Sequence, residues 1–328
     1  MDRVICIGST DLDIFFYTKE GIVVQHRGDL LRRRLIGFER SAKILAQDLK
    51  LRHGGSAANA ALSFARLGIP AGLISAVGDD AIGAEELRYL RKNHVGTSHM
   101  QVIPGAATNF SLILTALPGS DHVIFLHHGS SDKMQVSDRT FRSMNASWLY
   151  VTSLGHNWKS QFATLLRYLD RSNAKLTWNP GALQLKGPVK VLKSCIRKTT
   201  VLLVNYDEAL ELLVRLTGRT KYRTPARASS ELSRFGADYT MVTHGREGAY
   251  LAHEGRVVHR AAWVGKTVNK TGAGDAFGSG FVAGLILYRH DIHRALSLAV
   301  SNSHFVVQSV GAQTGLLTRH TLNRVKWS

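Results

Sequence analysis

The sequence has 328 residues, of which 44% are hydrophobic and 20% are charged, a composition typical of a globular protein with a sizeable core. This length suits one large or two ordinary domains. No apolar run approaches eighteen residues, and the opening stretch MDRVICIGST enters a strand pattern at once, so we expect neither a membrane span nor a signal peptide. Two cysteines, Cys6 and Cys195, exclude a disulfide framework and favour a reducing cytoplasm.

The charge is strongly positive, because 42 Lys and Arg stand against 24 Asp and Glu, which gives a formal net charge of +18. Such a balance is typical of nucleic-acid binding, of membrane-surface binding or of attraction for anionic ligands. Nucleic-acid binders usually show dense basic runs, and here the one tight run is Arg32-Arg33-Arg34. We therefore favour an anionic substrate or a generally basic proteome. Nucleic acid stays open as an alternative partner, and a membrane is not expected.

The predicted elements alternate between strands and helices from the start of the chain. A buried strand at Val4–Gly8 comes first, and a helix at Ser56–Leu67 follows the pair Gly54-Gly55. Strands separated by helices of ten to fifteen residues indicate a parallel sheet with crossover helices. Further strands are predicted at 73–77, 108–116, 123–126, 148–152, 175–178, 201–204 and 239–243, and further helices at 82–93, 276–288, 292–308 and from 318 onward.

Two acids follow the first strand, in the stretch Gly8-Ser9-Thr10-Asp11-Leu12-Asp13. Ligands of α/β sheets bind beyond the carboxyl ends of the strands, which places Asp11 and Asp13 well for one. A carboxylate suits a polyol because it accepts two hydrogen bonds and donates none. The alternative is that both acids are turn formers.

The segment 14–53 is the least regular part of the chain. Ile22–Val24 reads as a strand, and residues 19–53 carry nine Lys and Arg against four Asp and Glu. Because a guanidinium group binds phosphate, carboxylate or sulfonate through two parallel hydrogen bonds, an arginine here is a candidate for contacting an anionic group on a substrate. The alternative is a solvated charged face. The candidates are Arg32, Arg33, Arg34 and Arg40.

The stretch Val268–Phe281, VNKTGAGDAFGSGF, combines a glycine turn with a single acid. Residues 276–288 are small and apolar without proline, which predicts a buried helix that begins at this turn. The free N–H groups and the positive dipole end at such a helix start favour an anion. Asp275 in the first turn is therefore either an N-terminal cap or a general base placed beside a phosphate group.

Two of these stretches together resemble a known family. GAGDAF at 272–277 and GGSAAN at 54–59, which runs on to ARLG at 65–68, resemble the two signatures of the ribokinase-like (phosphofructokinase-B) carbohydrate kinases. The resemblance implies a single kinase domain over 1–328 with an α/β fold of three layers (α/β/α), a mainly parallel central sheet and a small β lid from about 14–53 and 99–128. It also implies ATP-dependent phosphorylation of a sugar hydroxyl group, with magnesium.

The resemblance further assigns roles within the two signatures. Asp275 would act as general base, and the N–H groups of Gly272, Ala273 and Gly274 would stabilise charge on the transferred phosphoryl group. The residues expected to bind the sugar are Asp13, Gly54, Gly55 and Asn59.

Four further residues would bind the nucleotide, and one would bind the metal. Glu208 would hold water on magnesium, although an ordinary acid in the first turn of a helix is the alternative for this position. The nucleotide phosphates would be met by Asn205, Thr243 and Gly245, and the adenine or its ribose by Asn302.

The sequence departs from the family pattern in two places. Asn269 stands where the family usually has the aspartate of a monovalent-cation site, so we expect Lys270 to supply positive charge in place of potassium. Ser56 and Ala57 replace the lysine-glycine pair of ribokinases proper, which argues against ribose as the acceptor.

Three interpretations of function remain open. The favoured one is a kinase of a sugar or sugar derivative that is phosphorylated or acidic. The others are a nucleoside kinase of the same family and a noncatalytic relative that binds nucleic acid or protein partners. A homodimer formed through the lid is a further expectation.

Overall fold

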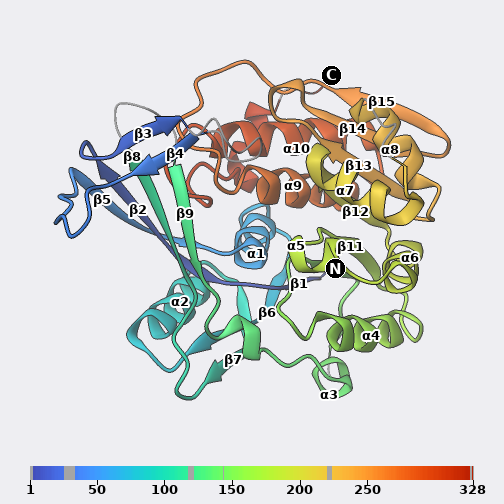
Figure 1. Cartoon of the computed structure of the whole chain (residues 1–328). Helices are drawn as coiled ribbons and strands as arrows, with labels where there is room; N and C mark the ends of the chain where they lie inside the picture. The colour runs from blue at the N-terminus through green and yellow to red at the C-terminus, as the bar shows by residue number, and fades with distance from the viewer. Residues whose placement is uncertain are drawn as a thin grey trace.

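The structure is a computed structural model, and it describes residues 3–25, 34–116, 122–142, 144–219, 224–325 and 327. Within these residues a nine-stranded sheet forms the centre, in the order β15-β14-β13-β12-β11-β10-β1-β6-β7 (Figure 1). The strands from β7 to β13 in this order are parallel, and β14 and β15 add an antiparallel hairpin. Their bounds are β1 (Val4–Ile7), β6 (Ala71–Gly78), β7 (Gly96–Ile103), β10 (Trp148–Val151), β11 (Lys175–Trp178), β12 (Val201–Asn205), β13 (Tyr239–Thr243), β14 (Ala249–His253) and β15 (Arg256–Arg260).

Helices cover both faces of this sheet and bury a hydrophobic cluster on each side (Figure 1). Strand β6 is buried along its whole length, as expected for a parallel strand covered on both faces. The first face carries α1 (Ser56–Arg66), α2 (Ala81–Lys92), α9 (Ala273–Leu287) and α10 (Ile292–Val306). The second carries α3 (Asp138–Arg142), α4 (Trp158–Leu169), α5 (Ala182–Leu185), α6 (Val189–Arg197), α7 (Tyr206–Thr217) and α8 (Pro225–Ser233). The result is three layers, α/β/α.

A smaller four-stranded sheet, which we call the lid, has the order β5-β2-β8-β9 (Figure 1). It consists of β2 (Asp11–Thr18), β5 (Asp48–Gly54), β8 (Phe110–Ala116) and β9 (His122–His127), with a two-stranded ribbon of β3 (Ile22–Gln25) and β4 (Arg34–Gly37). Three residues, Gly8-Ser9-Thr10, separate β1 from β2, so the chain passes directly from the central sheet into the lid.

The two acids that follow the first strand lie on β2 and not in a turn, which was the alternative for them. This strand pairs antiparallel with β5 and parallel with β8, and these pairings supply the backbone hydrogen bonds that a turn would lack. Asp13 and Phe15 alternate with solvent-facing neighbours and are 5% and 1% exposed. The inner face of the lid is therefore turned toward the protein.

The outer face of the lid is apolar and open to solvent. Residues at paired positions of neighbouring strands lie on one face of a sheet. The register therefore forms an unbroken apolar row across all four strands of the lid. Leu49 and Phe125 in this row are 55% and 53% exposed. The row consists of Ile14, Phe16, Leu49, Leu51, Leu112, Leu114, Val123 and Phe125.

The end of the chain differs from expectation in one element, since the helix expected from 318 onward is a short 3-10 segment at Arg319–Arg324. In the ranges that the structure describes, every helix is too short or too polar to cross a membrane.

Candidate active site

The helix α9 begins at a turn that only glycine fits. Gly272 has φ 78°, in the left-handed region, and a Cβ added there would lie 2.5 Å from the Cα of Ala312. The first helical turn follows directly, with the N–H of Ala273 donating to the Lys270 carbonyl oxygen at 3.2 Å and Gly274 next in line. The sequence prediction of a glycine turn that opens a buried helix is confirmed by this geometry.

Asp275 in this first turn contacts a distant part of the chain. Its Oδ2 accepts a hydrogen bond from Asn59 Nδ2 at 2.8 Å. Asn59 lies on the first turn of α1, just after Gly55, whose φ of 89° and close approach to Thr10 again require glycine. The two signature stretches, whose contacting residues are 216 positions apart, therefore meet at one place.

The lid brings two further acids to this place. Asp13 accepts a hydrogen bond from the Ser111 hydroxyl group and lies over Gly54, where any side chain would collide with its carboxylate. Asp11 accepts hydrogen bonds from Ser9 Oγ at 3.0 Å and from Asn109 Nδ2 at 2.9 Å. Several acids thus line the space in front of the double glycine, an arrangement suited to the hydroxyl groups of a polyol.

Burial and mutual repulsion raise the pKa values of these acids. Burial raises the pKa of Asp275 to about 7, hydrogen bonds from Asn59 and Ser56 lower it, and the charge of Asp11 raises it. Burial also raises the pKa of Asp13 to about 7, against the bond from Ser111 and with additional repulsion from neighbouring acids. A carboxyl group with a pKa near neutral pH suits a general base.

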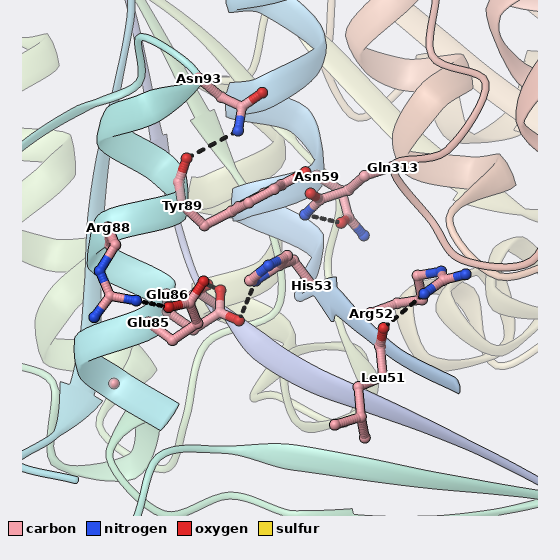
Figure 2. A network of polar contacts seen from close by, with 12 residues as sticks. Leu51, Arg52, His53, Asn59, Glu85, Glu86, Arg88, Tyr89, Asn93 and Gln313 are labelled. Atoms are coloured by element: carbon pink, nitrogen blue, oxygen red, sulfur yellow. Dashed lines mark hydrogen bonds and ion pairs between the residues drawn. The ribbon is translucent and has the colours of Figure 1, made fainter. Parts of the chain in front are cut away.

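A buried network that sequence reasoning missed supports the double glycine. Glu86, 1% exposed, accepts a hydrogen bond from Thr10 Oγ1 at 3.1 Å, and its Oε1 lies 2.6 Å from His53 Nδ1 (Figure 2). The His53 ring stacks on Tyr89 with centroids 3.5 Å apart. The residue before Gly54 is thereby fixed by two contacts from α2. These pairs are separated by 33 to 76 positions in the sequence.

A pocket of about 250 Å³ opens on the other side of the α9 start. Ala273 and Gly274 form part of its wall, so the helix turn that carries Asp275 also borders the pocket. Thr243 and Gly245, the predicted phosphate contacts, also line it. The remaining wall combines cationic and aromatic side chains, among them Arg246, Trp263, Lys270, Phe277 and His304.

Comparison with known proteins assigns this arrangement to a family. The family model described as pfkB family carbohydrate kinase matches residues 2–319. The chain belongs to the PfkB family. A 2-dehydro-3-deoxygluconokinase from Thermoproteus tenax is 30% identical over 266 residues, which cover 77% of this chain and 78% of that protein. A ribokinase from Haemophilus influenzae is 22% identical over 279 residues, which cover 84% and 88%.

Solved structures share the fold over nearly the whole chain. A nucleoside kinase from Methanocaldococcus jannaschii, an archaeal member of the ribokinase family, has a TM-score of 0.80 at 20% identity and covers 99% of this chain and 97% of its own. A ribokinase from Cryptococcus neoformans in complex with ADP has a TM-score of 0.75 at 23% identity, with 99% of each chain covered. The expected three-layer fold with a mainly parallel sheet is confirmed. The protein is a carbohydrate kinase of the PfkB family.

Glu208, predicted to hold water on magnesium, and Asn205, predicted to meet a nucleotide phosphate, form a helix cap in this PfkB chain. Asn205 Oδ1 accepts a hydrogen bond from the Glu208 N–H, and Glu208 Oε2 accepts one from the Asn205 N–H, both at 2.9 Å. This reciprocal pair begins α7, as the alternative for Glu208 foresaw. Burial raises the pKa of Glu208.

The donor set still fits magnesium. Within the described ranges there is no cluster of three His, Cys, Asp or Glu side chains that could hold a metal ion. Magnesium in kinases is bound by one or two carboxylates together with substrate phosphates and waters. Glu208 would hold the ion through a water molecule, and the nucleotide phosphates would supply further ligands.

Asn302 lies inside the protein, with its side chain fully buried. Its Nδ2 donates hydrogen bonds to Ser63 Oγ at 3.0 Å and to the carbonyl oxygen of Ala276 at 2.8 Å, and its Oδ1 accepts one from the Leu317 N–H at 2.9 Å. From the same helix, Ser303 and His304 line the pocket that also contains Thr243 and Gly245. We therefore leave Asn302 out of the proposed nucleotide site and assign it to the packing of α9 against α10.

Of the arginines predicted to meet an anionic substrate, Arg32 and Arg33 lie outside the described residues, as does the side chain of Arg34. Arg40 is exposed. The structure adds a different candidate, Arg52, which pairs directly with Asp13 across β5 and β2.

Proposed function

We propose that this chain transfers the terminal phosphoryl group of ATP to a hydroxyl group of a sugar derivative that carries an acidic group. The observation that supports the reaction is the position of Asp275. It lies in the helix turn whose residues Ala273 and Gly274 line the nucleotide pocket, and it is bonded to Asn59 on the acceptor side. One carboxylate can thus reach an acceptor hydroxyl group beside the terminal phosphate.

In this reaction Asp275 takes the proton of the hydroxyl group as that oxygen attacks phosphorus. The N–H groups of Gly272 and Gly274 stabilise the negative charge on the transferred phosphoryl group, whereas the predicted third donor, the N–H of Ala273, is bonded to the Lys270 carbonyl oxygen. Asp13 and Asn59 hold the acceptor through its other hydroxyl groups, while Thr243 and Gly245 hold the nucleotide phosphates. Magnesium supplies neutralisation of the phosphate charge when it is bound. The lid covers the acceptor and excludes water that would otherwise hydrolyse ATP.

Arg52 supports the acidic character of the acceptor. Its register places it on the inner face of the lid beside Asp13, and its stem lies close over Gly311. Its Nη1 donates to the carbonyl oxygen of Leu51 at 2.9 Å, so the guanidinium group is bound to a neutral group. Lys50, the next cation on this face, is paired with Asp48 at 3.0 Å. The Thermoproteus tenax relative, named for a sugar acid, agrees with this assignment.

The test is a panel of sugars, sugar acids, sugar phosphates and nucleosides, assayed for ADP release with purified protein. We expect turnover with a sugar acid or sugar phosphate, and Asp275→Asn should lower kcat by orders of magnitude while nucleotide affinity is retained. Preference for nucleosides would favour the alternative of a nucleoside kinase. Equal turnover in Asp275→Asn would remove the assignment of the base.

Two variants test the acidic group. Arg52→Met should raise KM for the acidic acceptor and leave the corresponding neutral sugar nearly unchanged, because a bidentate contact to the acid is lost. Lys50→Met is the matched control on the same face of the same strand. Equal effects of the two variants, or an equal effect on acidic and neutral acceptors, would contradict the role of Arg52.

We also propose that two chains associate through the outer face of the lid. Its exposed apolar row is the support, since monomeric proteins rarely expose a contiguous apolar surface of this kind. The buried free thiols of Cys6 and Cys195 support a reducing compartment such as the cytoplasm. Nucleic-acid binding at a charge of +18 is tested by titrating DNA at several salt concentrations, where phosphate contacts give a steep salt dependence.

A further inference from the structure

Gln313 lies beside the proposed base but belongs to neither signature stretch. Its side chain is 5% exposed, and its backbone carbonyl accepts a hydrogen bond from Arg66 Nη1 at 2.8 Å. The preceding residue, Ala312, packs against Gly272 at the start of α9. The loop that carries Gln313 is therefore fixed both to α1 and to the turn of the catalytic helix.

Two hydrogen bonds connect Gln313 to the base. Gln313 Nε2 donates to Asn59 Oδ1 at 2.9 Å, and Asn59 Nδ2 donates to Asp275 Oδ2 at 2.8 Å. Figure 2 shows the first of these bonds, with the two amides facing one another. Asn59 is 4% exposed, so bulk water does not compete for either bond. The three residues come from α1, α9 and the loop after α10.

The direction of these bonds follows from the chemistry of the groups. An ionised carboxylate only accepts hydrogen bonds, so Asn59 must turn its NH₂ group toward Asp275. Its oxygen then faces Gln313, which must present an NH₂ group in turn. If the Gln313 amide were rotated by half a turn, its oxygen would face the Asn59 oxygen. Asn59 would then no longer be held with its NH₂ group toward Asp275.

We propose that Gln313 is a positioning residue that fixes the amide orientation of Asn59, so that Asp275 receives a hydrogen bond on Oδ2 and keeps its remaining lone pairs for the acceptor hydroxyl group. This inference rests on the proposed function, in which Asp275 is the base. Gln313 acts through Asn59 and does not itself touch the reacting atoms.

Burial and the charge of Asp11 raise the pKa of Asp275, whereas the hydrogen bond from Asn59 lowers it. Charged or titratable groups face Asp275 from β2 and β1 and from β10, namely Asp11, Asp13, Cys6 and Tyr150. Burial keeps the Cys6 and Tyr150 groups neutral by raising their pKa values well above the usual range. The two acids repel the charge of Asp275, whereas Asn59 and Ser56 on α1 stabilise it. Loss of the Asn59 bond should therefore raise the pKa of Asp275 further.

The experiment compares pH profiles of kcat for the wild type, Gln313→Leu and Gln313→Glu. Leucine removes the donor without adding charge, and the introduced carboxylate accepts from Asn59 and draws its NH₂ group away from Asp275. We expect the acid limb of the profile to move up by about one pH unit in both variants. Activity should fall about tenfold at pH 6.5 and stay within about twofold of wild type at pH 9.

Arg66→Met is the matched control, because Arg66 anchors the backbone of the same residue without taking part in the relay. It should lower thermal stability and leave the acid limb in place. An Asn59→Ala background should also cancel most of the effect of Gln313→Leu, since coupled residues are not additive.

The outcomes separate the two proposals. A wild-type protein that phosphorylates no acceptor, or whose acid limb persists in Asp275→Asn, overturns the proposed function. An acid limb that stays at its wild-type pH in Gln313→Leu and Gln313→Glu overturns the role of Gln313 alone. An equal shift of the acid limb in Arg66→Met does the same. If Gln313→Leu fails to fold, Gln313→Met, which also removes the donor without adding charge, decides.

Discussion

Replacing Gly272 by alanine should destabilise the protein, whereas the same change at Gly274, two residues later, should stabilise it. Gly272 has φ 78°, which costs an alanine about 1–2 kcal/mol. The added Cβ would also lie 2.5 Å from the Cα of Ala312, an overlap with backbone that costs about 1–3 kcal/mol more. We therefore expect a loss of about 2–5 kcal/mol in the free energy of unfolding.

Gly274 offers the matched comparison. A Cβ there meets nothing within 4 Å, and the residue lies in helical backbone, so alanine should add about 0.5–1 kcal/mol of stability. Because Gly274 lines the nucleotide pocket, the same methyl group should raise KM for ATP. Stability and function would thus change in opposite directions.

The assay is denaturant unfolding of the ligand-free proteins, followed by kinetics with ATP. A loss below about 1 kcal/mol for Gly272→Ala would show that the turn does not depend on glycine as we argue. Equal destabilisation by Gly274→Ala would show that the helix start is crowded on both sides.

Three further predictions concern pH, cations and assembly. The pKa of Asp13 is raised to about 7, so between about pH 4 and 7 the folded protein holds a proton that the unfolded chain has released. The free energy of unfolding should therefore fall as the pH rises through this range. Asp13→Asn should flatten this decrease, as measured by thermal melts of ligand-free protein. Lys270 lines the nucleotide pocket, so exchanging potassium for a large organic cation should barely change turnover, and strong potassium dependence would refute this. Leu51→Lys combined with Phe125→Lys should convert a dimer to a monomer in sedimentation experiments, and a monomeric wild type would contradict the lid interface.

The layered fold was predictable because its signals are local. Buried strands alternating with helices lie along the chain, and the apolar run after Asp275 is helical from its own composition. Strand β2 was missed because its sequence begins with two acids, and it becomes a strand through partners that begin 37 and 99 positions later, at Asp48 and Phe110. Short-range patterns carry no information on such pairings.

The site residues also divide into those with a local sequence signal and those that depend on distant contacts. Asp275 and Asn59 stand out because each lies in a glycine-marked motif, and the structure brings them into contact. Gln313 is 254 positions from its partner Asn59, and Glu86 sits in an ordinary helix, so neither had a local signal beyond the nearby Gly311-Ala312 pair. Asn302 illustrates the opposite case, in which a family position carries a buried amide that holds helices together.

Asp13 and Asp275 belong to different bodies of the molecule, since one is carried by the lid and the other by the central layers. Their separation is therefore not set by any single rigid element, and several short connections, among them Gly8-Ser9-Thr10 after β1 and Gly55 before α1, form the covalent joint. An acceptor held by both carboxylates would act as a tie between the two bodies. Binding of the correct acceptor and closure of the lid over it would then occur together. A molecule that contacts only one of the two carboxylates would not hold the lid against the central layers.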